Sequence, residues 1–348
     1  MENKIIHAEQ SEIMLHQETP LTDLAMEYVK ASKSKNTLAN YRHSMELFQK
    51  YMLKEHGLNL KNQNDCLKVD QVMVSNYLSY LTSNARKNDE NKKPLKALKA
   101  SSVLRHLSAL RDFFGYVVET TPFPLKNPTV GKKIEDVIEG IQRKLGTAPK
   151  QKRAITLDVE EIILNEIEGT SLTDKRDAAM IALGFAGAFR RSELAGIDMD
   201  HLTFKDSGIV LYLPKSKTDQ KQQGTWKHIA YGKSKNTCPV RLIQQWLIVS
   251  KIQEGAIFRR IRKGDHLGDR INPASIARII KNRAEKAGLD RTQFSGHSMR
   301  RGYITHARES GLDMVTIMQH TGHKRFETVK GYVEMIDVEK NSATKGLY

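Results

Sequence analysis

A cluster of chain breakers constrains the fold of this sequence more than any other feature. Three prolines and a glycine fall within residues 120–133, TTPFPLKNPTVGKK, and breakers at this density end a helix. Before the cluster, from Leu21 to about Val118, apolar residues recur at helical spacing; after it, strand-like runs occur as well. A chain of 348 residues is long enough for two cores, so we expect two domains.

The first half is predicted to be a small helical bundle. Its clearest segment begins near residue 101 and carries apolar side chains at helical intervals: Val103, Leu107, Leu110, Phe114 and Val117. We place an N-terminal extension at 1–20, the helical domain at 21–121 and a linker region at 122–153. A short amphipathic piece around Ile134 and Ile141 lies inside that linker region.

The second half is predicted to be mostly helical with a small antiparallel sheet. The β-branched and aromatic runs 208–214 and 225–232 are separated by a polar stretch, as in two strands of one hairpin. Helical patterns cover 176–189, 241–252, 274–287, 297–309, 314–320 and 326–336. This domain is placed at 154–340, with a tail at 341–348, and the fold class is therefore mainly α with a small antiparallel β-sheet.

Charge and cysteine content narrow the classes of function. Lys and Arg number 56 against 40 Asp and Glu, a net charge of +16 that favours a polyanionic partner such as nucleic acid. Cys66 and Cys238 are isolated, so neither a disulfide framework nor a thiolate zinc site is indicated. No signal peptide and no apolar run of membrane-spanning length is present, and we expect a cytoplasmic protein that contacts no membrane.

Two groups of basic residues are candidates for a functional site. Arg190 and Arg191 follow a buried apolar run, although an arginine here could equally pair with Glu193 at the helix end. His297 and Arg300 are three positions apart and share one helix face, where both could reach one phosphate; such a pair is more often a solvated face.

Four further residues have weak signals when taken singly. His320 and His323 suggest a metal pair, with His297 or His306 as further ligands, but no carboxylate or cysteine stands at a customary spacing, and no metal is expected. Lys217 lies in the loop between the two strands, where lysines are usually solvated. Tyr332, alone, resembles a core or surface tyrosine.

The order of these residues is far more specific than any one of them. The segments AFRRSEL, LPKSKTDQ, FSGHSMRRGYITHARESG and IMQHTGHKRFETVKGYV, with SKNTLANYRHSMELFQKYM and KASSVLRHLSALRDFF in the first half, together resemble the tyrosine recombinases, also called phage integrases. The resemblance covers about residues 20–340. It implies a C-shaped clamp around duplex DNA, formed by an N-terminal core-binding bundle and a C-terminal catalytic domain.

The resemblance also implies the catalytic residues. Tyr332 is expected to be the nucleophile that forms a 3′-phosphotyrosyl bond, supported by Glu193 at the family's acidic position and assisted by the other catalytic residues: Arg190, Lys217, His297, Arg300 and His323. The arginines suit the charge on the phosphate, His297 is the expected base and Lys217 the expected acid. His323 would bond the phosphate or position the tyrosine. Neither ATP, a divalent metal nor another cofactor is required.

The expected partner is double-stranded DNA with short inverted repeats. Four protomers on two sites would exchange strands through a Holliday junction, with or without accessory proteins, in the nucleoid. Candidate phosphate contacts in the first half are Arg42, Arg86, Lys87, Lys92, Lys93, Lys96, Lys99, Arg105 and Arg111, although residues 85–99 could also form a solvated loop. Integration, excision and dimer resolution all fit. The alternatives are a type IB topoisomerase and a DNA-binding regulator that does not cut.

Overall fold

The computed structural model describes residues 32–83, 96–122, 124–148, 152–167, 169–214, 224–329 and 331. The chain divides into two compact units, 1–149 and 150–348. Each has its own hydrophobic core, which fulfils the expectation of two cores for a chain of this length.

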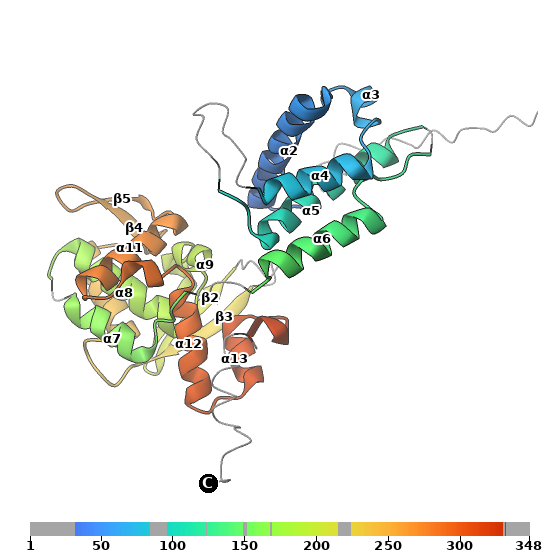
Figure 1. Cartoon of the computed structure of the whole chain (residues 1–348). Coiled ribbons are helices and arrows are strands. Elements are labelled where there is room, and N and C mark those ends of the chain that lie inside the picture. The colour runs from blue at the N-terminus through green and yellow to red at the C-terminus, as the bar shows by residue number, and fades with distance from the viewer. Residues whose placement is uncertain are drawn as a thin grey trace, which may run out of the picture. The chain divides into compact units, whose positions relative to one another are not determined.

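The first unit is built from helices alone in its described part (Figure 1). Helix α5 shows why: Val103, Leu107, Leu110, Phe114 and Val117, the residues of the predicted stripe, are all buried. Asp70 caps α4 by accepting from the backbone N–H of Met73 at 2.8 Å. The helices are α2 (Lys35–His56), α3 (Gln63–Cys66), α4 (Gln71–Leu81), α5 (Ala100–Glu119) and α6 (Lys132–Leu145).

Helix α6 lies within the segment 122–153 that the sequence indicated as a linker region. Its residue Ile134 is completely buried, and the helix packs against α4 and α5. The amphipathic pattern around Ile134 therefore marks a helix that completes the core of the first unit.

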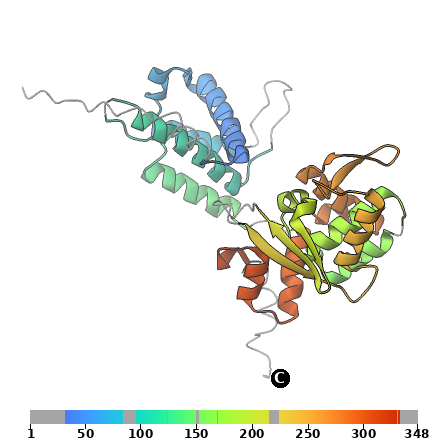
Figure 2. The same cartoon turned by 180° about the vertical axis from the view of Figure 1, so that it is seen from behind.

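The second unit surrounds the long buried helix α8 with helices and two small sheets (Figures 1 and 2). Helices α7, α10 and α12 pack against α8. The elements are α7 (Leu157–Glu166), α8 (Leu172–Ala186), α9 (Arg191–Ala195), β1 (Leu202–Lys205), β2 (Gly208–Leu213), β3 (Thr225–Ala230), α10 (Pro239–Ser250), β4 (Arg259–Arg262), β5 (His266–Arg270), α11 (Pro273–Lys286), α12 (Ser298–Glu309) and α13 (Met314–Thr321), with 3₁₀ turns at Met199–His201 and Arg291–Gln293.

The larger sheet has the order β1-β2-β3 and is antiparallel throughout. Strands β2 and β3 are the two predicted runs, paired with Ile209 opposite Ile229 and Leu211 opposite Lys227. Strand β1 and the β4-β5 hairpin extend the predicted sheet content. The fold class, mainly α with small antiparallel sheets, is confirmed.

The helices predicted for the last third of the chain are present. Helices α10 to α13 begin and end within two residues of their predicted bounds. The predicted helix 326–336 has helical backbone at 326–329, and most of its remainder lies outside the described residues. None of the helices in the described ranges combines the length and hydropathy that a membrane span requires.

Candidate active site

The candidate active site surrounds the turn between α8 and α9. Ala188 in this turn has a φ of 48°, the left-handed region that residues with a Cβ seldom adopt, and it is fully buried. The carbonyl oxygens of Ala186, Gly187 and Ala188 each accept a hydrogen bond from a different element of the unit. The turn is thus the point where several distant segments are tied together.

Arg190 stands directly after this turn, as the N-cap of α9, and is bound by Glu193. Its backbone N–H donates to Glu193 Oε2 at 2.8 Å, and its Nη1 donates to Oε1 at 2.6 Å. The ion pair between Arg190 and Glu193, which the sequence suggested as an alternative interpretation of this arginine, is therefore present. The Arg190 side chain still keeps 13% of its surface exposed, so it can be held by Glu193 and also face a ligand.

Glu193 is ionised in spite of being buried. Burial alone would raise the pKa of this carboxyl, but the hydrogen bonds from Arg190 and the charges of Arg190 and Arg300 outweigh it and hold the pKa below its ordinary value. A charged carboxylate in a buried place gives Arg190 one fixed orientation. The supporting role of Glu193 in catalysis stays a prediction.

Arg300 on α12 is buried and bridges two segments. Its Nη1 donates to the carbonyl of Ala188 at 2.7 Å, and its Nη2 donates to the carbonyl of Thr321. Nη2 also lies 3.0 Å from Nε2 of His323. The forked guanidinium therefore connects the α8–α9 turn with the end of α13 and the residues that follow it.

His323 is held by Arg300 on one side and by Thr321 on the other. Its Nδ1 lies 2.7 Å from Thr321 Oγ1, and that hydroxyl donates its own proton to the carbonyl of Ile317. Burial, followed by the charges of Arg300 and Arg190, lowers the pKa of His323 to about 3. The ring is consequently neutral at physiological pH, with Nδ1–H donating to Thr321 and Nε2 accepting from Arg300.

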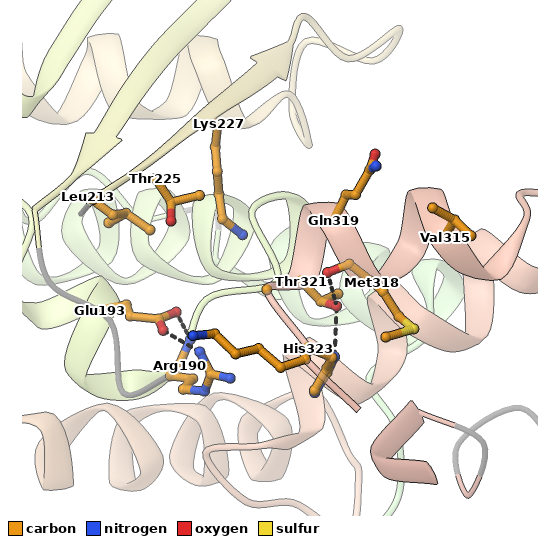
Figure 3. A pocket seen from close by; sticks show the side chains of 13 residues that line it. Arg190, Glu193, Leu213, Thr225, Lys227, Val315, Met318, Gln319, Thr321 and His323 are labelled. Carbon is orange, nitrogen blue, oxygen red and sulfur yellow. Dashed lines mark hydrogen bonds and ion pairs between the residues drawn. The ribbon is translucent and has the colours of Figure 1, made fainter. Parts of the chain in front are cut away.

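A cleft of about 440 Å³ lies beside these side chains (Figure 3). Its lining residues include Arg190 at the N-cap of α9, Glu193 from α9, Lys227 from β3 and His323 after α13. Arg300 contacts His323 but is not itself among the described residues that line the cleft. The cleft therefore presents cationic and hydrogen-bonding groups where an anion can enter.

Of the other three predicted catalytic residues, the structure describes only His297. His297 is exposed at the N-cap of α12, one turn before Arg300, and is not among the described residues that line the cleft. Lys217 and Tyr332 lie outside the described residues. The base, acid and nucleophile roles of these three residues stay predictions.

Lys227 is a residue of the site that the sequence reasoning missed, and His320, which it considered only as a metal ligand, lies beside Lys227. Lys227 is only 7% exposed, and its Nζ donates to the carbonyls of Gly187, at 2.6 Å, and His320. His320 Nε2 lies 2.9 Å from the carbonyl of Ala186, so this ring is engaged with the turn and not arranged with His323 as a metal pair. The alternation of β3 carried the signal, because Lys227 and the core residue Ile229 lie two positions apart on one face.

The DNA-binding candidates of the first unit are exposed wherever they are described. These residues are Arg42, Lys96, Lys99, Arg105 and Arg111. The remaining candidates fall outside the described residues: Arg86, Lys87, Lys92 and Lys93.

Arg300 owes its position partly to Gly302 on the same helix. A Cβ added at Gly302 would lie 1.6 Å from the carbonyl oxygen of Ile155, a backbone atom that cannot swing away. We therefore expect Gly302→Ala to lower the free energy of unfolding of the second unit by about 3 kcal/mol, because α12 must be displaced. Both tryptophans, Trp226 and Trp246, belong to that unit, so a urea titration followed by tryptophan fluorescence measures the effect.

Gly115→Ala is the matched control for this change. Gly115 lies within α5 and has nothing within 4 Å of an added Cβ. Alanine there should leave the fluorescence transition unchanged and stabilise the helix by up to about 1 kcal/mol, as measured by circular dichroism. Equal stability of Gly302→Ala and the unsubstituted protein would show that the close packing of α12 is unimportant.

Comparison with known proteins identifies the architecture. Residues 153–338 match the phage integrase family, and residues 26–120 match the family's N-terminal SAM-like domain. The chain belongs to the phage integrase family. The predicted family and the predicted class of enzyme, a tyrosine recombinase, are thereby confirmed.

Relatives of this tyrosine recombinase include curated proteins of three bacteria. An integrase/recombinase xerD homolog of Selenomonas ruminantium is 35% identical over 223 residues, which make up 64% of this chain and 65% of the relative, slightly under two thirds of its length. A tyrosine recombinase of Pseudothermotoga lettingae is 22% identical over 90% of this chain and 92% of its own. Tyrosine recombinase XerC of Escherichia coli O157:H7 is 25% identical over 86% of this chain and 85% of its own.

Solved structures share the fold. The XerH site-specific recombinase bound to its palindromic difH substrate matches with a TM-score of 0.67 at 16% identity, over 94% of this chain and 85% of its own. The Tn1549 transposon integrase bound to transposon right end DNA matches with a TM-score of 0.60 at 15% identity, over 91% of this chain and 97% of its own. At such identities the likeness supports the fold alone.

Proposed function

We propose that this tyrosine recombinase cleaves and rejoins duplex DNA at specific sites through a 3′-phosphotyrosyl bond to Tyr332. The observation that carries the proposal is the cleft in which Arg190, fixed by ionised Glu193, faces His323, with Arg300 in contact behind that ring. These groups come from three segments far apart in the sequence. A site of forked donors that is partly shielded from water suits an anionic phosphate.

The proposed reaction is an in-line displacement at phosphorus. The phenolic oxygen of Tyr332 forms a bond to the phosphorus, and the bond from phosphorus to the 5′ oxygen breaks. His297 takes the phenolic proton, and Lys217 supplies the proton with which the 5′ oxygen leaves as a hydroxyl. Rejoining is the reverse reaction, in which a DNA 5′ hydroxyl attacks the phosphotyrosine.

Arg190 and Arg300 are proposed to stabilise the negative charge that develops on the nonbridging oxygens. Both are guanidiniums, whose several fixed donors match the oxygens of a phosphate. His323 would position Tyr332, or would hydrogen-bond the phosphate in the tautomer that carries its proton on Nε2 in place of Nδ1. The reaction would then need neither ATP nor a divalent metal, since side chains supply the charge and both proton transfers.

The proposed partner is double-stranded DNA that carries short inverted repeats. The structures that share the fold include XerH bound to a palindromic difH substrate and a lambda integrase tetramer bound to a Holliday junction. By analogy, four copies of this chain would exchange strands between two sites, in the cytoplasm and at the nucleoid. The exposed basic residues of α2 and α5 would contact phosphates on the DNA.

The test is covalent trapping on a nicked duplex in EDTA. Cleavage beside the nick releases a short fragment with the leaving 5′ hydroxyl, so the protein stays joined to the DNA. Candidate duplexes come from the inverted repeats near the chain's own gene, and scrambled repeats serve as the control. We expect a denaturation-resistant adduct with the former alone. Binding without any adduct, or an adduct that requires Mg²⁺, would contradict the proposed function.

A further inference from the structure

The buried ammonium of Lys227 occupies a place that the proposed chemistry leaves unexplained. Its side chain extends from β3 toward the α8–α9 turn and α13 (Figure 3). The Nζ lies 4.9 Å from the centre of the Phe189 ring and donates to the carbonyls of Gly187 and His320. A desolvated lysine is costly, so its place in the fold requires a compensating role.

Three side chains donate hydrogen bonds to the carbonyls of three consecutive residues, 186–188, and thereby connect the α8–α9 turn with α13. His320 bonds the carbonyl of Ala186, Lys227 that of Gly187 and Arg300 that of Ala188. On the other side, Lys227 and Arg300 donate to the last two carbonyls of α13, at residues 320 and 321. The last carbonyls of a helix have no partner within the helix, and they attract cations. The contacts that Lys227 and Arg300 make with the end of α13 and with the turn after α8 are therefore favourable.

We propose that Lys227 is a positioning residue, which clamps the end of α13 onto the α8–α9 turn and thereby holds His323 in the active site. The inference rests on the proposed function, because it concerns the same cleavage reaction. His323 comes three residues after His320, whose carbonyl Lys227 holds. Tyr332 follows nine residues later in the sequence, so the clamp also fixes the start of the segment that leads to the nucleophile.

Lys227 has one competing role, that of the proton donor assigned above to Lys217. It lines the cleft, and its pKa falls to about 7 because burial outweighs the attraction of Glu193 and because Arg300 and Arg190 repel a further charge. However, Lys227 already directs hydrogen bonds at two carbonyl oxygens. The two roles of Lys227 therefore predict different rates of adduct formation on a substrate whose leaving group needs no proton. Loss of a proton donor would not slow cleavage of that substrate, whereas loss of a positioning residue would.

The experiment compares two linkages in the nicked duplex, the normal phosphodiester and one with sulfur in place of the leaving 5′ oxygen. A thiolate leaves without a proton, so sulfur rescues a variant that lacks the acid. We expect Lys227→Met to slow adduct formation about 100-fold on both linkages, because misplaced groups cost that much. DNA affinity in a gel shift should change less than about twofold, since Lys227 is too buried to grip the duplex.

Lys227→Arg is the conservative variant, because its guanidinium can still bridge two carbonyls. It should recover adduct formation to within about tenfold of the unsubstituted protein. Tryptophan fluorescence confirms folding of each variant, and should Lys227→Met not fold, Lys227→Arg on both linkages decides the question alone. Rescue of either variant by sulfur would make Lys227 the acid, and full activity of Lys227→Met would exclude the clamp. No adduct with the unsubstituted protein would instead indicate failure of the proposed function.

Discussion

Replacing Arg300 by alanine is expected to slow cleavage by at least about 1000-fold, even in the fraction of protein that stays folded. One oxyanion donor is typically worth about 100- to 1000-fold, and Arg300 also holds His323. The change leaves the buried carbonyls of Ala188 and Thr321 without their donor, so the free energy of unfolding should fall by about 1–3 kcal/mol. Single-turnover adduct formation measures the first effect and urea titration the second.

Arg301→Ala provides the control in the same turn of α12. Arg301 is the next residue of the same helix, and its Nη1 donates to the carbonyl of Lys152. Its loss should slow cleavage by less than about tenfold, as for a residue outside the reacting groups. Arg300→Lys should behave like Arg300→Ala in catalysis, because an ammonium cannot fork between two acceptors. Similar rates for the Arg300 and Arg301 variants would remove Arg300 from the mechanism.

Tyr332→Phe is expected to abolish adduct formation entirely while leaving DNA binding intact. The change removes one hydroxyl and retains the ring, so the nucleophile is lost with the smallest possible change of side chain. Because no covalent intermediate can form, the loss should exceed that of any assisting residue. The adduct assay on the nicked duplex provides the measurement, with gel shift to verify binding.

Tyr348→Phe serves as the control, since it changes another tyrosine of the same C-terminal region. It should form the adduct at the rate of the unsubstituted protein. Should Tyr332→Phe also form an adduct, a different side chain would be the nucleophile, and the residue roles derived from the family resemblance would need to be reassigned.

Much of the fold follows from the sequence because long periodic segments determine it. The stripe from Val103 to Val117 and the runs of β2 and β3 are unambiguous patterns, and each forms the expected element. Strands β4 and β5 have the sequences RRIR and HLGDR, in which charged residues obscure any strand periodicity. Their pairing depends on tertiary context, which local patterns do not contain.

The sequence pointed to residues of the candidate site but not to the contacts between them. Arg190 pairs with Glu193, and Arg300 contacts His323, while the catalytic roles that the family resemblance implies for these four residues stay predictions. The spacing of His297 and Arg300 predicts a shared helix face, yet His297 is the exposed N-cap residue before α12, whereas Arg300 is buried and donates to the carbonyl of Ala188. Lys227 was missed because a lysine in a strand suggests solvent, whereas its partners are carbonyls distant in sequence.

The central claim is most directly tested by locating the DNA on the protein. The adduct trapped with a nicked duplex is digested with nuclease and trypsin, and its modified peptide is sequenced by mass spectrometry. Residues 331–340, GYVEMIDVEK, form a tryptic peptide with a single tyrosine. We predict a nucleotide attached through its 3′ phosphate to Tyr332 in this peptide. A nucleotide on any other residue, or one linked through a 5′ phosphate, would contradict the assignment of this chain's nucleophile and chemistry.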